Sequence, residues 1–394
     1  MAVILAIVVM GISVTPVATE TQQQTLLIAR MISKINEAEI YNNVYRLQNF
    51  TTRYYGYSGN IEASTWLYNK LSNISGLNVE YQGGEYRNVI ATLPGLDPTS
   101  TTIYMVGAHY DSTSSDRSYA PGATDNGGGV AIVLEFARIM SQYRFRHTLK
   151  FAFWNTEEGG LGNPSSGSNI YVDYALANNL NISLYINFDS SCYDPDNHFV
   201  LDIMYNNQSQ WVSDMMTQYN SLYKINFTLT YNVHTCGSDH WPFWSHGYTA
   251  VMTHEESHGP AHSPNDTIDK VSTMYAKKNG QLGMSVLANL AQARAPTDLN
   301  KDGIVNIIDI AIVSKAYGSK PGDPRWNETA DLDKNGIINI VDLAMVAKDF
   351  GKRTLMYYEK QALAELAAQI DASAREENLS NRPKLVQSKD QFTL

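Results

Sequence analysis

The chain has 394 residues, 43% of them hydrophobic, and a formal net charge of −10. This length allows two to three domains, and the hydrophobic content is that of a globular protein with a buried core. The acidic balance argues against a nucleic-acid binder, which would need a basic surface. Only Cys192 and Cys236 are present, too few for a disulfide framework or a cysteine zinc site. One bridge between these two cysteines in an oxidising compartment is left open.

The first residues predict export. Residues 1–18 are mostly apolar and the polar sequence TETQQQ follows, which is typical of a signal peptide at 1–22, although the usual basic start is missing. A short membrane anchor or a misassigned start is the alternative. No other apolar run is long enough to cross a bilayer, so we expect no stable membrane span in the mature chain and a secreted or cell-surface attached protein. Asn-x-Ser/Thr triplets, which fit an exported glycoprotein, begin at Asn49, Asn73, Asn181, Asn207, Asn226, Asn265, Asn327 and Asn378.

Hydrophobic periodicity divides residues 23–294 into alternating helices and strands. Helices are predicted over 25–40 with 41–45 as an optional extension, over 63–71, after Asp125, around 211–216 and over 267–293. Strands are predicted over 77–81, 86–93, 102–107, from 149 onward, and over 183–188, 199–204, 225–231 and 249–252. This alternation predicts an α/β domain, in which a mostly parallel central sheet has helices on both faces.

Three of the predicted strands are followed by potential metal ligands. His109 and Asp111 follow the strand over 102–107, Glu157 and Glu158 follow the strand from 149, and Asp189 follows the strand over 183–188. Because ligands bind outside the carboxyl ends of parallel strands, we expect these side chains to form one site. Period-2 geometry lets His109 and Asp111 point the same way, so that the carboxylate orients the imidazole. A polar pair at a strand end, without metal, is the alternative.

The residue types in this set suit two metal ions. Zinc accepts imidazole and carboxylate ligands, and a catalytic zinc keeps one coordination position for water. Two neighbouring cations repel each other, so a shared carboxylate is needed, and Asp125 is the candidate. Glu157, next to the proposed ligand Glu158, is then free to act as general base on a water whose pKa the metal lowers from 15.7 to about 7. The proposed ligands are His109, Asp125, Glu158, Asp189 and His262.

Six motifs occur in the order GAHYDS, PGATDNGGGVA, FWNTEEGGLG, INFD, SDHWPF and HSPNDT. In this order they resemble the co-catalytic di-zinc exopeptidases of the bacterial leucyl aminopeptidase and glutamate carboxypeptidase type, over roughly residues 25–294. The resemblance implies the zinc exopeptidase fold and two zinc ions per catalytic domain. One zinc would be held by His109, Glu158 and Asp125, and the other by Asp189, His262 and Asp125.

The same resemblance implies roles for further residues. Asp111 would orient His109, Glu157 would be the catalytic base, and a non-proline cis peptide would join Asp125 to Asn126. The residues that would line the substrate site are Ser238, Asp239 and His240. Two departures from the family pattern put an oxyanion-stabilising aromatic side chain and one pocket wall in doubt: Ala261 precedes the last ligand, and GGLGNPSSGS is longer than the usual turn.

A second zinc pattern is present but is expected not to bind. His254-Glu255-Glu256-Ser257-His258 matches His-Glu-x-x-His, which requires a helix that places both histidines on one face. A strand precedes this segment and Gly259-Pro260 follows at once, so a helix of adequate length is not expected. A loop that lines the pocket is the interpretation.

Two close repeats begin at Asp298 and Asp331. Each has oxygen ligands at positions 1, 3, 5, 9 and 12, the backbone carbonyl at position 7 and Gly at 6, which is the calcium-loop pattern followed by a helix. The proposed calcium ligands are Asp298, Asn300, Asp302, Ile304, Asn306 and Asp309, then Asp331, Asp333, Asn335, Ile337, Asn339 and Asp342. With Asp at position 12 and no clear entering helix, residues 298–351 resemble a dockerin module, a small all-α domain with two Ca²⁺. Asp/Asn-rich turns without metal are the alternative.

We expect the two repeat helices to pack antiparallel. The proposed packing residues are Ile307, Ile308, Ile310, Ala311 and Val313 against Ile340, Val341, Leu343, Ala344 and Val346. Positions 10 and 11, Ile307-Ile308 and Ile340-Val341, are apolar where many dockerins carry hydroxyl residues. They would bind a cohesin-like receptor or cell-surface protein, or else dock on the chain's own catalytic domain or tail. Residues 352–394 predict a marginal helix and a disordered end.

These features predict an exported zinc metallopeptidase that acts on peptides, most directly an aminopeptidase that removes N-terminal residues. A carboxypeptidase or a dipeptidase with the same site is the nearest alternative. A single-zinc enzyme like glutaminyl cyclase is disfavoured because His109, needed only for a second metal, is present. A non-catalytic surface protein with the dockerin-like part as its working module is disfavoured because Glu157 and every proposed ligand are present.

Overall fold

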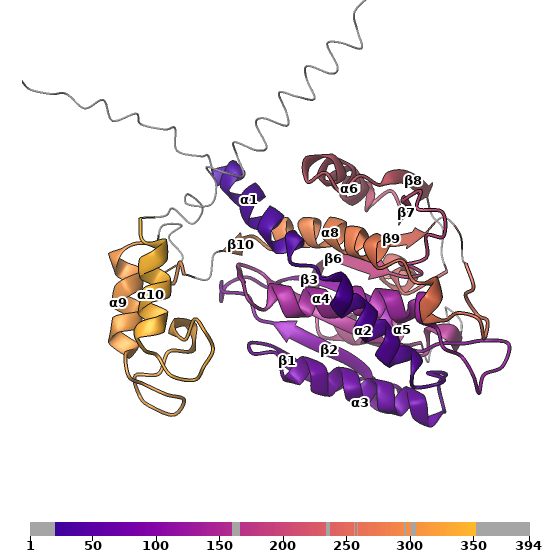
Figure 1. Cartoon of the computed structure of the whole chain (residues 1–394), viewed down its shortest axis with the longest axis horizontal. Coiled ribbons are helices and arrows are strands. Elements are labelled where there is room, and N and C mark those ends of the chain that lie inside the picture. Colours follow the sequence, from indigo (N-terminus) through magenta and orange to yellow (C-terminus); the bar gives the residue numbers. More distant parts are fainter. Residues whose placement is uncertain are drawn as a thin grey trace, which may run out of the picture.

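The structure is a computed structural model that describes residues 20–159, 166–233, 237–255, 257, 259–294, 297–300 and 305–351. Most of the predicted signal peptide, the predicted tail, Cys236 and the calcium ligands Asp302 and Ile304 lie outside these ranges. An α/β domain precedes a small helical module, which lies beside it (Figure 1). Within the described ranges, no helix combines the length and the apolar character that a bilayer crossing requires.

The α/β domain is built on an eight-stranded sheet of order β1-β2-β5-β3-β6-β9-β7-β8. The strands are β1 (Asn78–Gln82), β2 (Asn88–Leu93), β3 (Thr102–His109), β5 (Thr148–Trp154), β6 (Asn181–Phe188), β7 (Val200–Tyr205), β8 (Thr228–Val233) and β9 (Ala250–Glu255). Strands β5, β3, β6 and β9 pair in parallel, as do β7 and β8. The pairs β1–β2, β2–β5 and β7–β9 are antiparallel. The predicted α/β class is confirmed, with a parallel centre and antiparallel pairs toward both edges.

Helices cover both faces of this sheet, as predicted (Figure 1). They are α1 (Glu20–Ser33), α2 (Glu37–Gln48), α3 (Ser58–Ser72), α4 (Gly128–Met140), α5 (Gly167–Ala177), α6 (Gln210–Leu222), α7 (His240–Ser245) and α8 (Thr273–Leu290). Alternate residues of β3 enter different cores: Val106 and Ala108 pack with α4 and α8, whereas Met105 packs with α5 and α7. This alternation follows from the period-2 geometry of a strand. A short ribbon of β4 (Arg144–Phe145) and β10 (Ala293–Arg294) closes the domain.

The clearest differences from the predicted elements concern the helices. The predicted helix over 25–40 is two helices, because the side chain of Asn36 accepts a hydrogen bond from the Ala38 N–H and starts α2 as an N-cap. Helices α5 and α7 were not predicted. Helix α7 has six residues with Pro242 among them, too short to show a helical period.

The helical module consists of α9 (Ile307–Ala316) and α10 (Ile340–Asp349). The Gly318 N–H donates to Ile338 O, and the Gly351 N–H donates to Val305 O. The end of each helix therefore lies beside the start of the other, and the helices are antiparallel as predicted.

The predicted packing surface of these helices is largely wrong. Val313 and Val346 are buried and Ile310 and Leu343 are half-buried. The exposed members of the predicted set are Ile307, Ile308, Ala311, Ile340, Val341 and Ala344. The core is completed instead by residues of the loops, Leu299, Val305, Ala330 and Ile338. The helices are apolar on more than one face, and the loops decide which face is covered.

The module also contacts the α/β domain. Lys334 Nζ lies 3.2 Å from both Ser75 O and Ser141 O, and Arg144 Nη2 donates to Thr329 O at 2.7 Å. An open cavity of about 640 Å³ lies beside these contacts, lined by residues of both parts, including Tyr143 and Trp326. The contacts use the second loop of the module and the residues just before it, so they leave the exposed positions 10 and 11 uncovered.

Candidate metal centre

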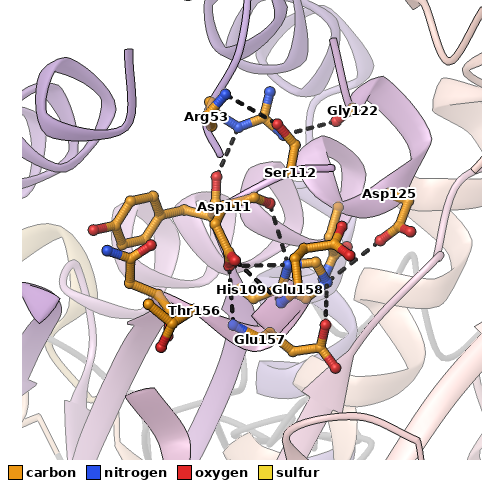
Figure 2. A network of polar contacts seen from close by, with 12 residues as sticks. Arg53, His109, Asp111, Ser112, Gly122, Asp125, Thr156, Glu157 and Glu158 are labelled. Carbon is orange, nitrogen blue, oxygen red and sulfur yellow. Dashed lines mark hydrogen bonds and ion pairs between the residues drawn. The ribbon is translucent and has the colours of Figure 1, made fainter. Parts of the chain in front are cut away.

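The carboxyl ends of the parallel strands place the predicted ligands at one edge of the sheet. Strand β3 ends at His109, β5 is followed by Glu157 and Glu158, and β6 is followed by Asp189. Asp125 lies in the turn that precedes α4, and its peptide bond to Asn126 is cis, as predicted. Figure 2 shows His109, Asp111, Asp125, Glu157 and Glu158 converging at this edge.

Asp125 lies between two imidazoles. Its Oδ1 is 3.3 Å from His109 Nε2 and its Oδ2 is 3.1 Å from His262 Nε2. Each carboxylate oxygen thus faces a different histidine. Asp125 is 6% exposed, and this two-sided arrangement is the one that a carboxylate shared by two cations requires.

The remaining carboxylates divide between the two histidines. Asp189 Oδ1 is 3.5 Å from His109 Nε2, and Glu158 Oε2 is 3.2 Å from His262 Nε2. The sequence analysis had paired Glu158 with His109 and Asp189 with His262, and the direct contacts give the opposite division. Donor atoms of His109, Asp125 and Glu158 also lie within 4.8 Å of one another, because the whole cluster is compact.

Asp111 links the imidazole to the Glu157–Glu158 segment. His109 Nδ1 is 3.2 Å from the Asp111 carbonyl oxygen and 3.4 Å from its Oδ1. The carboxylate of Asp111 accepts hydrogen bonds from the Glu157 N–H at 3.3 Å and the Glu158 N–H at 3.1 Å. Asp111 therefore orients His109 and sets the start of the turn that carries both glutamates (Figure 2).

Asp189 is oriented by a buried chain of hydrogen bonds. Trp154 Nε1 donates to Tyr185 Oη at 2.7 Å, and Tyr185 Oη donates to Asn187 Oδ1 at 2.9 Å. Asn187 Nδ2 donates to Ser238 Oγ at 2.7 Å, and Ser238 Oγ donates to Asp189 Oδ2. The predicted site residue Ser238 thus donates a hydrogen bond to a proposed ligand, Asp189.

Asp239 and His240 follow Ser238 at the start of α7, and both are fully buried. Burial is the largest influence on the Asp239 carboxyl and raises its pKa to about 7. The negative charge of Asp189 acts in the same direction. These two residues therefore extend the dense group of titratable side chains beside the proposed ligands.

The acidic surroundings control protonation at the site. Burial would lower the pKa of His109, but Asp189, Asp111 and Asp125 outweigh it and raise the pKa well above the usual value. Hydrogen bonds to Asp125 and Glu158 raise the pKa of His262 to about 11. Burial and then the charge of Asp125 raise the pKa of Glu158 to about 7. Without metal, the surrounding negative charge favours the protonated form of both imidazoles.

Two buried residues near Asp125 were not identified from the sequence. Asp266 accepts hydrogen bonds from the Thr124 N–H at 2.7 Å and the Asp125 N–H at 3.0 Å. Its place in the HSPNDT motif, four residues after His262, was a signal that could have revealed it. Arg53, in Figure 2, contacts the carbonyl groups behind the site, and nothing in its local sequence indicated such a role.

The structure also describes the second zinc pattern and one of the two cysteines. His254 and Glu255 are in strand β9, so the His-Glu-x-x-His pattern does not begin on a helix, as expected. Cys192 is a free, buried thiol, and Cys236, with which a bridge was left open, lies outside the described residues, as do residues 160–165 of the unusual turn over 159–168.

The second repeat forms a calcium-type loop. Donor atoms of Asp331, Asp333 and Asp342 lie within 4.8 Å of one another. Asp331 Oδ1 and Oδ2 accept hydrogen bonds from the Asn335 and Gly336 N–H groups, and Gly336 has φ 79°, which glycine adopts readily. In the first repeat, Asp309 accepts from the Leu299 and Asn300 N–H groups, as Asp342 does from Leu332 and Asp333.

Comparison with known proteins agrees with this geometry. The model of peptidase family M28 matches residues 88–287, and the model of the dockerin type I domain matches residues 296–351. A probable leucine aminopeptidase of Arthroderma otae is 25% identical over 289 residues, which are 68% of this chain and 76% of that protein.

Solved structures share the fold of the α/β domain. The LapA aminopeptidase of Legionella pneumophila superposes with a TM-score of 0.61 at 18% identity, over 74% of this chain and 79% of that one. The glutaminyl cyclase of Bacteroides thetaiotaomicron gives 0.53 at 18% identity, over 65% and 98%. Structural likeness at this identity shows the fold alone. The family match extends over half of the chain and includes all five proposed ligands and Glu157. The chain belongs to peptidase family M28. Its zinc-dependent aminopeptidase-like domain is followed by a dockerin type I domain.

Proposed function

We propose that this protein is an exported aminopeptidase with two zinc ions in one site. The observation that carries the proposal is Asp125, whose two carboxylate oxygens face His109 and His262 separately. We propose that His109 and Asp189 hold one ion, that Glu158 and His262 hold the other, and that Asp125 is shared; the direct contacts between these side chains support this division. The leucine aminopeptidase relatives support the proposed activity.

The residues fit this metal pair. Imidazole and carboxylate groups are suitable zinc ligands, and both ring nitrogens that would bind metal point at carboxylates. Glu158 Oε1 is buried without a hydrogen-bond partner, which is costly for a carboxylate unless a cation completes its surroundings. The raised pKa values of His109 and His262 record the same excess of negative charge. Two divalent cations would replace the protons that these imidazoles hold without metal.

Zinc, when bound, supplies a Lewis acid for the substrate carbonyl and lowers the pKa of a water molecule. We propose that Glu157 Oε2 accepts the proton of the attacking water and returns it to the leaving amine. This oxygen is 4.0 Å from His109 Nε2. Glu157 therefore lies near the proposed ligands without being one of them. Burial raises the pKa of Glu157 well above its usual value, a property that suits a carboxyl group that both takes and gives a proton.

The charge of the site favours an amino terminus as the bound end of the peptide. The charged groups that the described structure places at the site are carboxylates and imidazoles, with which a cationic ammonium group is compatible. A carboxypeptidase would need an accessible cation for the substrate carboxylate. Arg53, which lies behind the site, is fully buried and donates to backbone carbonyls.

The test uses metal analysis and blocked peptides. We expect about two zinc ions per chain, and cleavage of peptides that have a free amino terminus and an amidated carboxyl terminus. Peptides with an acetylated amino terminus should resist, and their cleavage would favour a carboxypeptidase. Conversion of an N-terminal glutamine with ammonia release would favour a cyclase. Glu157→Ala should lose most activity yet keep zinc, whereas Glu80→Ala on exposed β1 should change neither.

We propose that the dockerin domain attaches the enzyme to a cohesin-like receptor at a cell surface. Ile307 and Ile340, at equivalent positions of the two repeats, are each 65% exposed, and Ile308 and Val341 beside them are 50% and 46% exposed. Apolar side chains exposed at matching positions are suited to a protein interface. The double variant Ile307→Asp and Ile340→Asp should abolish binding to purified cohesins while it leaves peptidase activity unchanged. Lys320→Asp, an exposed control, should retain binding.

A further inference from the structure

Arg53 is a fully buried cation behind the metal centre, and the proposed function assigns it no task. It lies between α2 and α3 and has 0% exposure. Burial is the largest influence on its guanidinium and lowers its pKa to about 10, while the charges of Asp266, Asp111, Asp125 and Glu158 oppose this change. The side chain is therefore charged at neutral pH. A fully buried charge is rarely retained unless its donors and its charge are both compensated.

The donors of Arg53 are used on backbone carbonyls rather than on carboxylates. Nε donates to Tyr110 O at 2.7 Å, Nη1 to Pro121 O at 2.6 Å and Nη2 to Gly122 O at 2.8 Å. Tyr110 is next to His109, and Gly122 is three residues before Asp125 (Figure 2). One rigid guanidinium thus joins the two segments that carry these ligands.

Hydrogen bonds of the Arg53 main chain also connect it to the segment that follows β5 and carries Glu158. The Arg53 N–H donates to Ser112 Oγ at 3.1 Å, and Ser112 Oγ donates to Ala120 O at 2.8 Å. The Arg53 carbonyl accepts a hydrogen bond from Asn60 Nδ2 at 2.7 Å. Asn60 and Asn155 donate to each other's amide oxygens at 2.8 and 3.1 Å, and Asn155 is two residues before Glu157. Every segment that carries a ligand from residue 109 to residue 158 is therefore attached to Arg53.

The space around the guanidinium is closed. A Cβ atom at Gly122 would lie 2.8 Å from Arg53 Nη2 and 2.5 Å from Ser112 Cβ, and Gly122 has φ 56°. Glycine is required there because the backbone must approach the guanidinium closely in a left-handed conformation. The loop before Asp125 is shaped around Arg53.

We propose that Arg53 is a positioning residue that preorganises the two-metal centre. It fixes the distance between the His109 strand end and the Asp125 turn, and its charge offsets the carboxylates without occupying the oxygen atoms that metal ions would bind. This inference depends on the proposed metal site. A residue that orients ligands from outside the coordination shell typically changes metal affinity 10- to 100-fold when it is removed.

The test compares variants by zinc affinity, measured by competition with a chromophoric chelator, and by the visible spectrum of the cobalt-substituted protein. Arg53→Met should weaken zinc binding about 10-fold or more, shift the cobalt spectrum and lower kcat with little change in KM. Arg53→Lys keeps the charge but cannot reach three carbonyls, so it should give a smaller loss. Ser112→Ala removes one tether and keeps Arg53, and it serves if neither Arg53 variant folds.

Leu287→Ala, a substitution in the buried face of α8, controls for lost stability alone. It should lower the unfolding temperature yet leave zinc affinity and the cobalt spectrum as in the unchanged protein. If folded Arg53 variants bind zinc with unchanged affinity and spectrum, or if Ser112→Ala has no effect where they do not fold, Arg53 is not a positioning residue. If the unchanged protein binds no zinc, the proposed function itself is wrong.

Discussion

Gly128, the first residue of α4, tests whether packing behind the Asp125 turn is as tight as the structure indicates. Its φ of −63° and ψ of −48° are helical, so alanine is compatible with the backbone. A Cβ atom there would lie 2.1 Å from Cys192 Sγ and 2.7 Å from Cys192 Cβ. Both distances are far below contact distance, and Cys192 is fully buried. The penalty of Gly128→Ala should therefore come from this contact alone.

The expected loss can be calculated from two opposing effects. Insertion of a methyl group into a well-packed core destabilises by about 1–3 kcal/mol. Replacement of glycine in a helical conformation stabilises by about 0.4–1 kcal/mol through the unfolded chain. Gly128→Ala should therefore destabilise the α/β domain by about 1.3 kcal/mol at the middle of these ranges, and by no more than about 2.6 kcal/mol. Because Cys192 Sγ contacts Ala123 O and Thr124 O at 3.8 and 3.9 Å, the displacement should reach the Asp125 turn and weaken zinc binding.

Calorimetry on the whole chain can measure this loss as the shift of the transition of the α/β domain. A double-mutant cycle with Cys192→Ala supplies the decisive comparison, because that substitution removes the Sγ atom and leaves only the 2.7 Å Cβ contact. The penalty of Gly128→Ala should fall by at least about 1 kcal/mol in this background, as expected for residues in contact. Penalties that add within about 0.5 kcal/mol would refute the reasoning.

Three further outcomes are expected. The carboxyl groups of Glu158 and Asp266, with pKa values raised to about 7 and about 6, bind more protons folded than unfolded. The metal-free α/β domain should therefore lose stability as pH rises from about 4 to about 7, and unfolding curves that show a gain would contradict this. Lys334→Ala removes the contacts to Ser75 O and Ser141 O and should increase the maximum dimension in small-angle scattering, whereas Lys348→Ala on α10 should not. Calcium chelation should melt the dockerin domain first, because a module of about 50 residues buries too little apolar surface; simultaneous melting of both domains would argue against this order.

Local patterns along the chain predicted most of the helices and strands of the α/β domain and named the candidate ligands. Strands were predicted over 102–107, from 149 onward and over 183–188, close to the observed ends at His109, Trp154 and Phe188, and the rule that parallel strands share one carboxyl edge places the following side chains together. The cis bond at Asp125–Asn126 followed from family motifs rather than from physical chemistry. The break between α1 and α2 was missed because one asparagine that caps a helix is a weak signal within a continuous apolar pattern.

Tertiary structure alone decided how these residues are combined. Sequence spacing does not show that Asp189 lies closest to His109 and Glu158 to His262, because these contacts form across the sheet edge. The proposed role of Arg53 depends on the carbonyl groups of residues 110, 121 and 122. Every residue type has a backbone carbonyl, so the sequence could not show which ones Arg53 contacts. In the dockerin domain, both faces of the helices carry apolar residues, so periodicity could not show that Ile307 and Ile340 lie outside while Val313 and Val346 lie inside. Which face of the helices is buried depends on the loops that pack against it, through contacts between residues far apart in the chain.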